Sequence, residues 1–395
     1  MKRITLALGA TLALAAAPAA ANDAIKIGYI TTLTTPAAVI GQDMKAAVEL
    51  SLDHIGGKIA GKPVEILFED DGFKPNIGRA KAEKLVRQEN VDVVAGFIWS
   101  HVLLASAKTV LQSGKFLIST NAGPSALAGK RCHENFFATR GQNDMLPMAL
   151  GEVMNADGIK SLYILAPNYA AGKDVAKGVE RTFKGKIAGR DFTKWGADAQ
   201  LDFSAELAKA KASGADALFV FYPGRASAAI VNQLKQAETL SNMKLYSVYT
   251  IDGLSLPRFQ KAGLDLVLGS RLADYWSPDL ATPENKKFVE GFVAKTGRLP
   301  SNYAAAAYDL LPYLKAAIEQ AGGDVSKSDA VREALRKANY KSVRGSYKLA
   351  KNHFPIDNYY ALKADAVDGR WTKVLGDKVM GGRADPYTET CAMGK

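Results

Sequence analysis

Two successive rounds of alternating strand and helix patterns constrain the fold of this 395-residue chain more than any other feature. In the first round, short runs of β-branched and aromatic residues, bounded by Gly, Pro, Asp or Asn, predict strands over residues 26–31, 63–69, 91–97 and 115–120. Amphipathic helices are predicted between them, as in residues 42–55, where four apolar side chains share one face. Near-continuous apolar strands separated by helices are typical of a parallel sheet covered on both faces.

The alternation restarts after Arg140, and the second round resembles the first. It predicts strands over residues 161–166, 215–222, 244–249 and 266–275, and helices over residues 143–155, 173–183, 203–212 and 226–240. Helices over residues 283–296, 303–321 and 329–338 follow, and then β-like segments at 344–349 and 358–363. This surplus of helix near the end suggests that the chain returns to complete its first unit.

Length supports two domains, because single hydrophobic cores stop growing at roughly 250 to 300 residues. The predicted fold class is α/β, with two doubly wound parallel-sheet lobes joined by crossover hinge strands. We predict lobe 1 over residues 22–140 and 269–348, and lobe 2 over residues 141–268 and 349–395, with return of the C-terminal tail to lobe 1 as an alternative. Ligands of such folds bind at the carboxyl ends of the strands, so functional residues are expected just after strands.

The N-terminus reads as a secretory leader. Met1-Lys2-Arg3 precedes an apolar stretch over residues 4–17, and Ala19-Ala20-Ala21 offers a cleavage site after Ala21. The apolar stretch is shorter than the roughly 20 residues that span a bilayer. No cysteine near the cleavage site could carry a lipid anchor. The expected location is the periplasm, with residues 1–21 removed.

Charge and cysteine content narrow the function classes. The formal net charge is +11, but the lysines are spread along the predicted helices, which favours a solvated basic surface and no nucleic-acid partner. Cys132 and Cys391 are the only cysteines, and an even pair in an exported chain predicts one disulfide. The four histidines lack metal-ligand spacing, so no metal site and no cofactor are predicted.

Enzyme motifs are missing from the sequence. There is no G-x-S-x-G elbow and no Walker A loop, and the first predicted strand is not followed by the glycines of a dinucleotide fingerprint. An enzyme on a doubly wound fold is therefore the weaker hypothesis.

Several short motifs together resemble a known family. They are Ile27-Gly28-Tyr29-Ile30, Ile40-Gly41-Gln42-Asp43, His54-Ile55-Gly56-Gly57, Ile59-Ala60-Gly61-Lys62 and Phe68-Glu69-Asp70-Asp71-Gly72. Over nearly the whole mature chain, the sequence resembles the leucine/isoleucine/valine-binding branch of periplasmic solute-binding proteins. The resemblance implies the type I periplasmic binding fold, a monomer without catalytic residues, and the permease and ATPase of an ABC importer as partners. A sensor subunit that passes its ligand to a membrane receptor stays open as an alternative.

The resemblance also implies where a ligand binds. In lobe 1 it points to two loops after strands, where a hydroxyl and helix N-terminal N–H groups suit a carboxylate; Ser100 could alternatively only cap its helix. Lobe 2 offers tyrosines and nearby residues after three strands, and one tryptophan is a weaker candidate at the hinge or rim. The implied residues are Trp99, Ser100, Asn121 and Gly123 in lobe 1, Tyr169, Ala171, Tyr222, Arg225 and Tyr249 in lobe 2, and Trp276.

The ligand class depends on one departure from the family. Amino acid binders of the family hold the ligand ammonium with an acid after the fifth strand of the second lobe, where this chain has Tyr249-Thr250. A buried ammonium without a carboxylate is costly, so we expect an aromatic carboxylate of the benzoate or phenylpropenoate type. Residues 352–356 (NHFPI) also resemble a segment of members that bind aromatic acids. Asp252 keeps the amino acid alternative open. Closure is expected about hinges near Arg140, Leu268 and Leu349.

Overall fold

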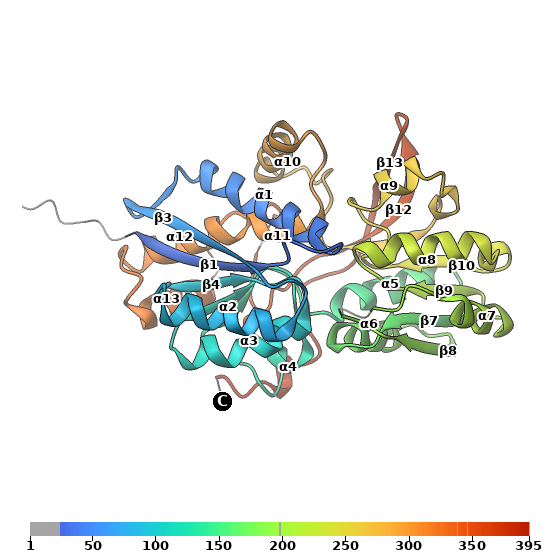
Figure 1. The fold of residues 1–395 in the computed structure, drawn as a ribbon, viewed down its shortest axis with the longest axis horizontal. Coiled ribbons are helices and arrows are strands. Elements are labelled where there is room, and N and C mark those ends of the chain that lie inside the picture. Colours follow the sequence, from blue (N-terminus) through green and yellow to red (C-terminus); the bar gives the residue numbers. More distant parts are fainter. Residues whose placement is uncertain (1–23, 197–198, 338, 346, 395) are drawn as a thin grey trace, which may run out of the picture.

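The computed structural model of the chain describes residues 24–196, 199–337, 339–345 and 347–394. Its strands form two separate sheets, which lie next to each other in Figure 1. The first has the strand order β2-β3-β1-β4-β5-β6, and the second has the order β13-β12-β11-β10-β9-β7-β8. The α/β class with two lobes is thereby confirmed. The predicted leader, residues 1–21, lies outside the described residues.

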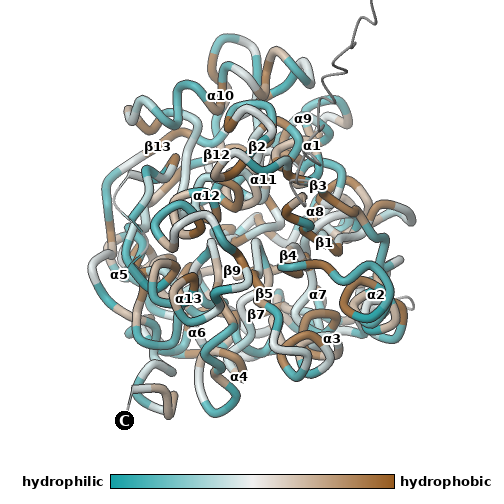
Figure 2. The backbone as a smooth tube through the Cα atoms, turned by 90° about the vertical axis from the view of Figure 1, so that its left-hand side faces the viewer, coloured by the Kyte–Doolittle hydropathy of each residue, from teal (hydrophilic) through white to brown (hydrophobic). Residues whose placement is uncertain are grey.

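The strands of the first sheet lie within residues 25–138. All of its pairs are parallel except β2 with β3. Its buried apolar strands fulfil the sequence pattern, and Figure 2 shows the segment around β4 in the brown of hydrophobic residues. The elements are β1 (Ile25–Thr31), α1 (Ala38–His54), β2 (Lys58–Ile59), β3 (Lys62–Asp70), α2 (Pro75–Arg87), β4 (Val93–Gly96), α3 (Ser100–Gln112), β5 (Phe116–Ser119), α4 (Ser125–Ala128) and β6 (Phe136–Ala138).

The second sheet is parallel from β8 to β11 and ends in an antiparallel hairpin of β12 and β13. In Figure 1 this hairpin rises above the rest of the second lobe. The elements are α5 (Met145–Ala156), β7 (Ser161–Pro167), α6 (Ala170–Thr182), β8 (Lys186–Thr193), α7 (Ser204–Ala212), β9 (Ala217–Val220), α8 (Arg225–Gln236), β10 (Lys244–Ser247), α9 (Leu256–Lys261), β11 (Arg271–Asp274), β12 (Tyr359–Val367) and β13 (Arg370–Met380), with 3-10 turns at Thr239–Ser241 and Asp265–Val267.

After β11 the chain returns to the first lobe, as the surplus of helix suggested. Three of the helices that follow contact α1, and the fourth packs on α12. They are α10 (Pro283–Thr296), α11 (Asn302–Tyr308), α12 (Leu310–Gln320) and α13 (Ser328–Lys337). Beyond β13 a 3-10 turn at Thr388–Thr390 leads to Cys391, which is disulfide-bonded to Cys132. The predicted disulfide is confirmed, and it holds the tail on the first lobe. The predicted lobe boundaries stay a proposal.

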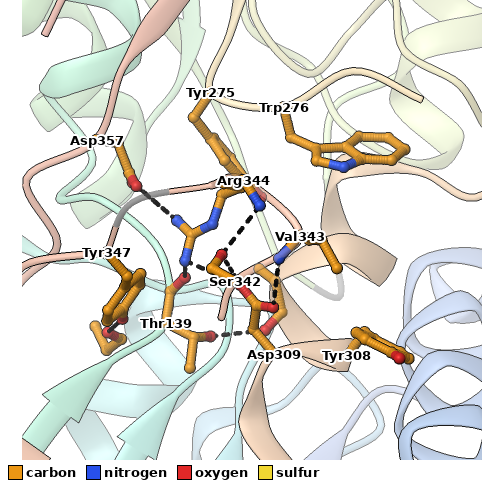
Figure 3. A network of polar contacts seen from close by, with 12 residues as sticks. Thr139, Tyr275, Trp276, Tyr308, Asp309, Ser342, Val343, Arg344, Tyr347 and Asp357 are labelled. Carbon is orange, nitrogen blue, oxygen red and sulfur yellow. Dashed lines mark hydrogen bonds and ion pairs between the residues drawn. The ribbon is translucent and has the colours of Figure 1, made fainter. Parts of the chain in front are cut away.

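Three chain segments cross between the lobes, and Arg344 joins them (Figure 3). Its Nη1 donates to both carboxylate oxygens of Asp357, at 2.8 and 2.9 Å. Its Nη2 donates to the Thr139 carbonyl oxygen at 2.6 Å and lies 3.3 Å from Asp309 Oδ2. The guanidinium also lies 5.4 Å from the centre of the Tyr275 ring. Arg344 is therefore buried, has its charge paired, and holds the crossover segments together.

Four details differ from the sequence predictions. Within the described part of 344–349 there is no sheet strand, only isolated bridges such as Leu349 with Pro355. The strand predicted over residues 266–275 is confined to β11. The helix predicted over residues 303–321 breaks at Asp309, whose buried carboxylate accepts from Ser342 and the Val343 amide. Strands β2, β6, β8 and β13 were not predicted. Among the described residues, no helix is long and apolar enough to cross a membrane.

Candidate functional site

An inner cavity lies between the two lobes, at the carboxyl ends of strands from both sheets. The space between its walls, counted together with its opening to solvent, is about 360 Å³. The residues that line it are Ile40, Ile98, Trp99, Ser100, Asn121, Ala122, Arg140, Asn143, Tyr169, Ala171, Val175, Phe221, Pro223, Tyr249 and Tyr303. Six of the ten predicted site residues are therefore brought together here: Trp99, Ser100, Asn121, Tyr169, Ala171 and Tyr249.

The turn after β4 aims Ser100 at the cavity. Gly96 and Phe97 both have positive φ, 109° and 68°, and a Cβ on Gly96 would lie 2.3 Å from the Ile30 carbonyl oxygen. Such backbone is costly for a residue like Phe97 and is concentrated at functional sites. Helix α3 begins at Ser100 with Trp99 as its N-cap and no side-chain cap. Ser100 is buried, and its hydroxyl lies 3.1 Å from Asn143 Nδ2, so it does not act as the helix cap.

Asn121 connects this turn to the crossover. Its Nδ2 donates to the Ile98 carbonyl at 2.7 Å, and its own carbonyl and Oδ1 accept from Arg140 Nη1 at 2.6 and 3.0 Å. Gly123 does not line the cavity; its amide donates to Asn143 Oδ1 at 3.1 Å, and a Cβ there would lie 3.0 Å from the Gly141 carbonyl oxygen. Gly123 thus allows close backbone packing against the crossover.

Arg140 is the one charged residue among the described residues that line the inner cavity. Its side chain is 5 % exposed, its guanidinium lies 4.6 Å from the centre of the Tyr249 ring, and its Nε has no hydrogen-bond partner among the described residues. The sequence reasoning placed Arg140 only at the hinge and missed it as a site residue. The sequence feature that could have identified it is its position: Arg140 directly follows residues 136–139, which are buried.

Aromatic side chains form the second-lobe wall. Tyr169 stacks on Trp195 and Phe221, with ring centres 5.5 and 6.4 Å apart. Tyr249, which follows β10, has a φ of +60°, a strained value for a tyrosine. Its ring centre lies 5.7 Å from that of Tyr303. Burial raises the pKa of the Tyr169 and Tyr303 hydroxyls, so both stay protonated.

Besides Gly123, three predicted site residues lie outside the inner cavity. Tyr222 points behind β9, where its hydroxyl lies 3.1 Å from Thr193 Oγ1 and its ring packs on Phe203. Trp276 donates from Nε1 to Asn285 Oδ1 at 2.7 Å and packs on Phe288. Arg225 is exposed and lines a second, outer chamber.

The outer chamber adjoins the inner cavity through Trp99 and Pro223, which line both. It has an empty volume of about 810 Å³ and carries Phe73 and Lys74 from the first lobe opposite Trp195 from the second. The Trp195 ring centre lies 5.6 Å from that of Phe73 and 5.8 Å from that of Trp99. The lobes therefore touch at an aromatic boundary between the two spaces.

Asp252, the alternative ammonium partner, does not line the inner cavity. One of its carboxylate oxygens accepts from the amides of Leu254 and Ser255 at 2.9 and 2.7 Å, so it closes its own turn before α9. The described residues that line the inner cavity include no Asp or Glu. The site is consequently cationic.

A buried acid links the lobes beside the cavity. Asp174 of α6 accepts from the Ser125 amide of α4 at 2.9 Å and from Asn143 Nδ2 at 3.1 Å. Burial raises the pKa of Asp174 to about 6, partly offset by the hydrogen bond from Ser125. The lobes therefore meet at a buried carboxyl whose pKa lies above that of an exposed Asp.

Comparisons with known proteins agree with this architecture. A family model described as "Periplasmic binding protein" matches residues 24–370. The curated "Leu/Ile/Val-binding protein homolog 6" of Brucella suis is 27% identical, with 94% of this chain and 95% of that protein covered. A solute-binding protein of an ABC transporter from R. palustris, solved in complex with benzoate, superposes with a TM-score of 0.86 at 25% identity over 94% of this chain and 100% of that one. A leucine-binding protein from Thermotoga maritima, 20% identical over 90% of this chain and 98% of its own, has the same fold with a TM-score of 0.79.

Proposed function

Because the chain belongs to the periplasmic binding protein family, we propose that it is the solute-binding component of an ABC importer and that its inner cavity binds an aromatic monocarboxylate. The ligand carboxylate lies on the wall formed by Ser100, Asn121 and Arg140, and the ring lies against the aromatic side chains of the second lobe. The protein has no catalytic step in this proposal. It acts in the periplasm as a monomer and delivers its ligand to a membrane permease driven by an ATPase.

Arg140 is the observation that carries the proposal. A guanidinium always bears its charge, and burial without an opposite charge is costly. The only hydrogen bonds that it makes to described residues go to neutral oxygens of Asn121, and its Nε has no partner there. Asp357 lies near enough to interact with the charge of Arg140 but forms no ion pair with it. A ligand carboxylate supplies that direct ion pair. Ser100 at the start of α3 supports the same end of the ligand, because helix N-termini stabilise anions.

The remaining walls favour a flat apolar body. Tyr169, Phe221 and Tyr249 offer ring faces and edges, while Ile40 and Val175 fill the sides. Aromatic pairs contribute about 0.5 to 1.5 kcal/mol beyond their buried area. The benzoate complex of the R. palustris relative supports this ligand class.

A branched-chain amino acid is the second candidate, because the curated relatives bear Leu/Ile/Val-binding names. Its carboxylate could use the same wall. Its ammonium would then face Arg140 and tyrosine hydroxyls instead of an acid, since Asp252 is engaged by its own turn. Several kcal/mol of ammonium hydration would be lost without compensation.

The mechanism is closure of the two lobes about the crossovers that Arg344 joins. We propose the lobe boundaries given above with two changes: β11, which pairs within the second sheet, belongs to lobe 2, and the tail beyond β13 belongs to lobe 1. An open protein would bind the carboxylate on the first lobe and crossover, after which Tyr169, Phe221 and Tyr249 cover the ring. The closed shape is then what the permease recognises.

Calorimetric titration of ligand-free protein with benzoate, cinnamate and leucine tests the proposal. We expect micromolar or tighter binding of at least one aromatic acid and no measurable heat from leucine. Micromolar binding of leucine, with no heat from either aromatic acid, would contradict the proposal.

A further inference from the structure

Two tyrosine hydroxyls in the inner cavity have no partner. Tyr249 and Tyr303 are 6 % and 2 % exposed, both line the cavity, and neither hydroxyl has a hydrogen bond to a described residue. Tyr249 comes from the second lobe after β10, and Tyr303 comes from α11 of the first. Their rings lie side by side, with centres 5.7 Å apart. A group placed between the lobes could therefore reach both hydroxyls.

Buried phenols elsewhere in the described chain are mostly satisfied. The hydroxyls of Tyr275, Tyr313 and Tyr347 donate to backbone carbonyl oxygens at 2.6 to 2.7 Å. Buried polar groups in folded proteins are generally paired, so each exception calls for an explanation. For Tyr249 and Tyr303 the cavity itself provides one: their partner is a polar group of the ligand.

An unsubstituted ring offers no such group. If the carboxylate lies on Arg140 and Ser100, the rest of benzoate is hydrocarbon, and the two hydroxyls would stay unpaired when the lobes close. The guanidinium of Arg140 covers a face of the Tyr249 ring, so the hydroxyl at the ring edge is left for another part of the ligand. A hydroxyl on the ligand ring can both donate and accept, which suits two phenols at once.

We propose that Tyr249 and Tyr303 are specificity-determining residues that bind a ring hydroxyl, so that the inner site selects hydroxylated aromatic acids over benzoate. This inference rests on the proposed function above and deepens it by naming the ligand class. A site built to hydrogen-bond a ligand hydroxyl rejects the analogue that lacks it, because its own polar groups are then left unpaired.

The test compares benzoate with 3-hydroxybenzoate and 4-hydroxybenzoate by calorimetric titration of the wild-type protein and of Tyr249→Phe, Tyr303→Phe and the double variant. Tyr359→Phe is the matched control, because its hydroxyl is also buried without a described partner but does not line the cavity. We expect the wild-type protein and the control to prefer one hydroxybenzoate by tenfold or more. Each single variant reduces that preference, and the double variant abolishes it with little change for benzoate.

Two results would overturn the inference. The first is equal affinity of the wild-type protein for all three acids. The second is an equal loss of affinity for all three acids in the Phe variants, which would mean that the tyrosine hydroxyls bind the ligand carboxylate. In both, benzoate binding by the wild-type protein leaves the proposed function standing. Absence of binding by every aromatic acid would overturn both proposals. Thermal melts of each variant without ligand show that it is folded.

Discussion

Arg140 and Arg344 are two buried arginines in the same crossover region, and their surroundings differ in one respect. Arg344, 7 % exposed, lies against two carboxylates, those of Asp357 and Asp309. Arg140, 5 % exposed, has no ion pair with any described residue and bonds only to Asn121 through one nitrogen. The Nε of each arginine has no hydrogen-bond partner among the described residues, so the two differ in charge pairing alone. The charge of Arg344 is paired within the chain, and Arg344 holds the crossovers together. Arg140 has no such ion pair with the described residues and faces a cavity, which is how a binding residue differs from a structural one of the same type.

The largest effect should come from Arg344→Met. Removing the guanidinium leaves the buried Asp357 and Asp309 without their partner, and loss of one member of a buried ion pair costs about 3 to 5 kcal/mol. Chemical denaturation without ligand measures this loss of unfolding free energy. An unchanged denaturation midpoint would contradict the structural role assigned to Arg344.

Ser100→Ala tests whether the wall around Arg140 binds the ligand carboxylate. The hydroxyl has a neutral partner, Asn143, and is not a helix cap, so folding stability should change little. A lost hydrogen bond to a charged group is worth about 1.5 to 3 kcal/mol, which predicts roughly 10- to 150-fold weaker binding of an aromatic acid by calorimetry. Ser106→Ala, on the same helix but bonded to the Val102 carbonyl at 2.9 Å, is the matched control and should bind normally. Equal affinities for the two variants would remove Ser100 from the carboxylate wall.

Asp174 is expected to make ligand binding depend on pH. Burial raises its pKa to about 6 in the closed state, above the roughly 3.9 of an exposed Asp, so closure takes up a proton. Ligand binding is therefore predicted to tighten as pH falls from about 7 to about 5, by at most about tenfold. Asp144 raises the pKa further, while Asn143 lowers it. Titrations of Asp174→Asn across this range should show a flatter profile; an unchanged slope would assign the protons elsewhere.

The smallest effect is expected for the folding of Arg140→Met. Two hydrogen bonds to Asn121 are lost, but so is the cost of burying a charge without an opposite partner. We expect the unfolding free energy of the ligand-free protein to change by about 1 kcal/mol or less, measured as for Arg344→Met. A loss as large as that of Arg344→Met would make both arginines structural.

The sequence predicted those parts of the fold that depend on local pattern. Strands β1, β3, β4 and β5 of the first sheet and helices α10 and α13 lie within a few residues of their predicted places, because apolar periodicity and caps specify them. Strand β13 was missed, since its alternation is carried mostly by charged and polar residues on an exposed hairpin. Residues 344–349 were predicted as a β-like segment from their composition. They lie instead in a crossover between the lobes, where no neighbouring strand pairs with the described part of the segment.

The site was predictable to the level of loops but not of single side chains. After β9, Phe221 faces the cavity and Tyr222 faces the core behind it, and successive extended residues alternate in this way. Both residues are aromatic, so composition could not tell which one lines the site. Arg140 escaped notice because its lack of a carboxylate partner is a property of the folded surroundings alone.

The most direct test of the account is a calorimetric cycle of wild-type protein and Arg140→Met with benzoate and with benzamide, its uncharged isostere. If Arg140 binds the ligand carboxylate, the wild-type protein prefers benzoate by roughly 30-fold or more. Benzamide leaves the buried charge of Arg140 without a partner, and loss of one member of a buried charge pair costs about 2 to 5 kcal/mol. Arg140→Met should then bind the two ligands with nearly equal affinity. A preference for benzoate that survives in Arg140→Met would contradict the central claim and place the carboxylate away from this arginine.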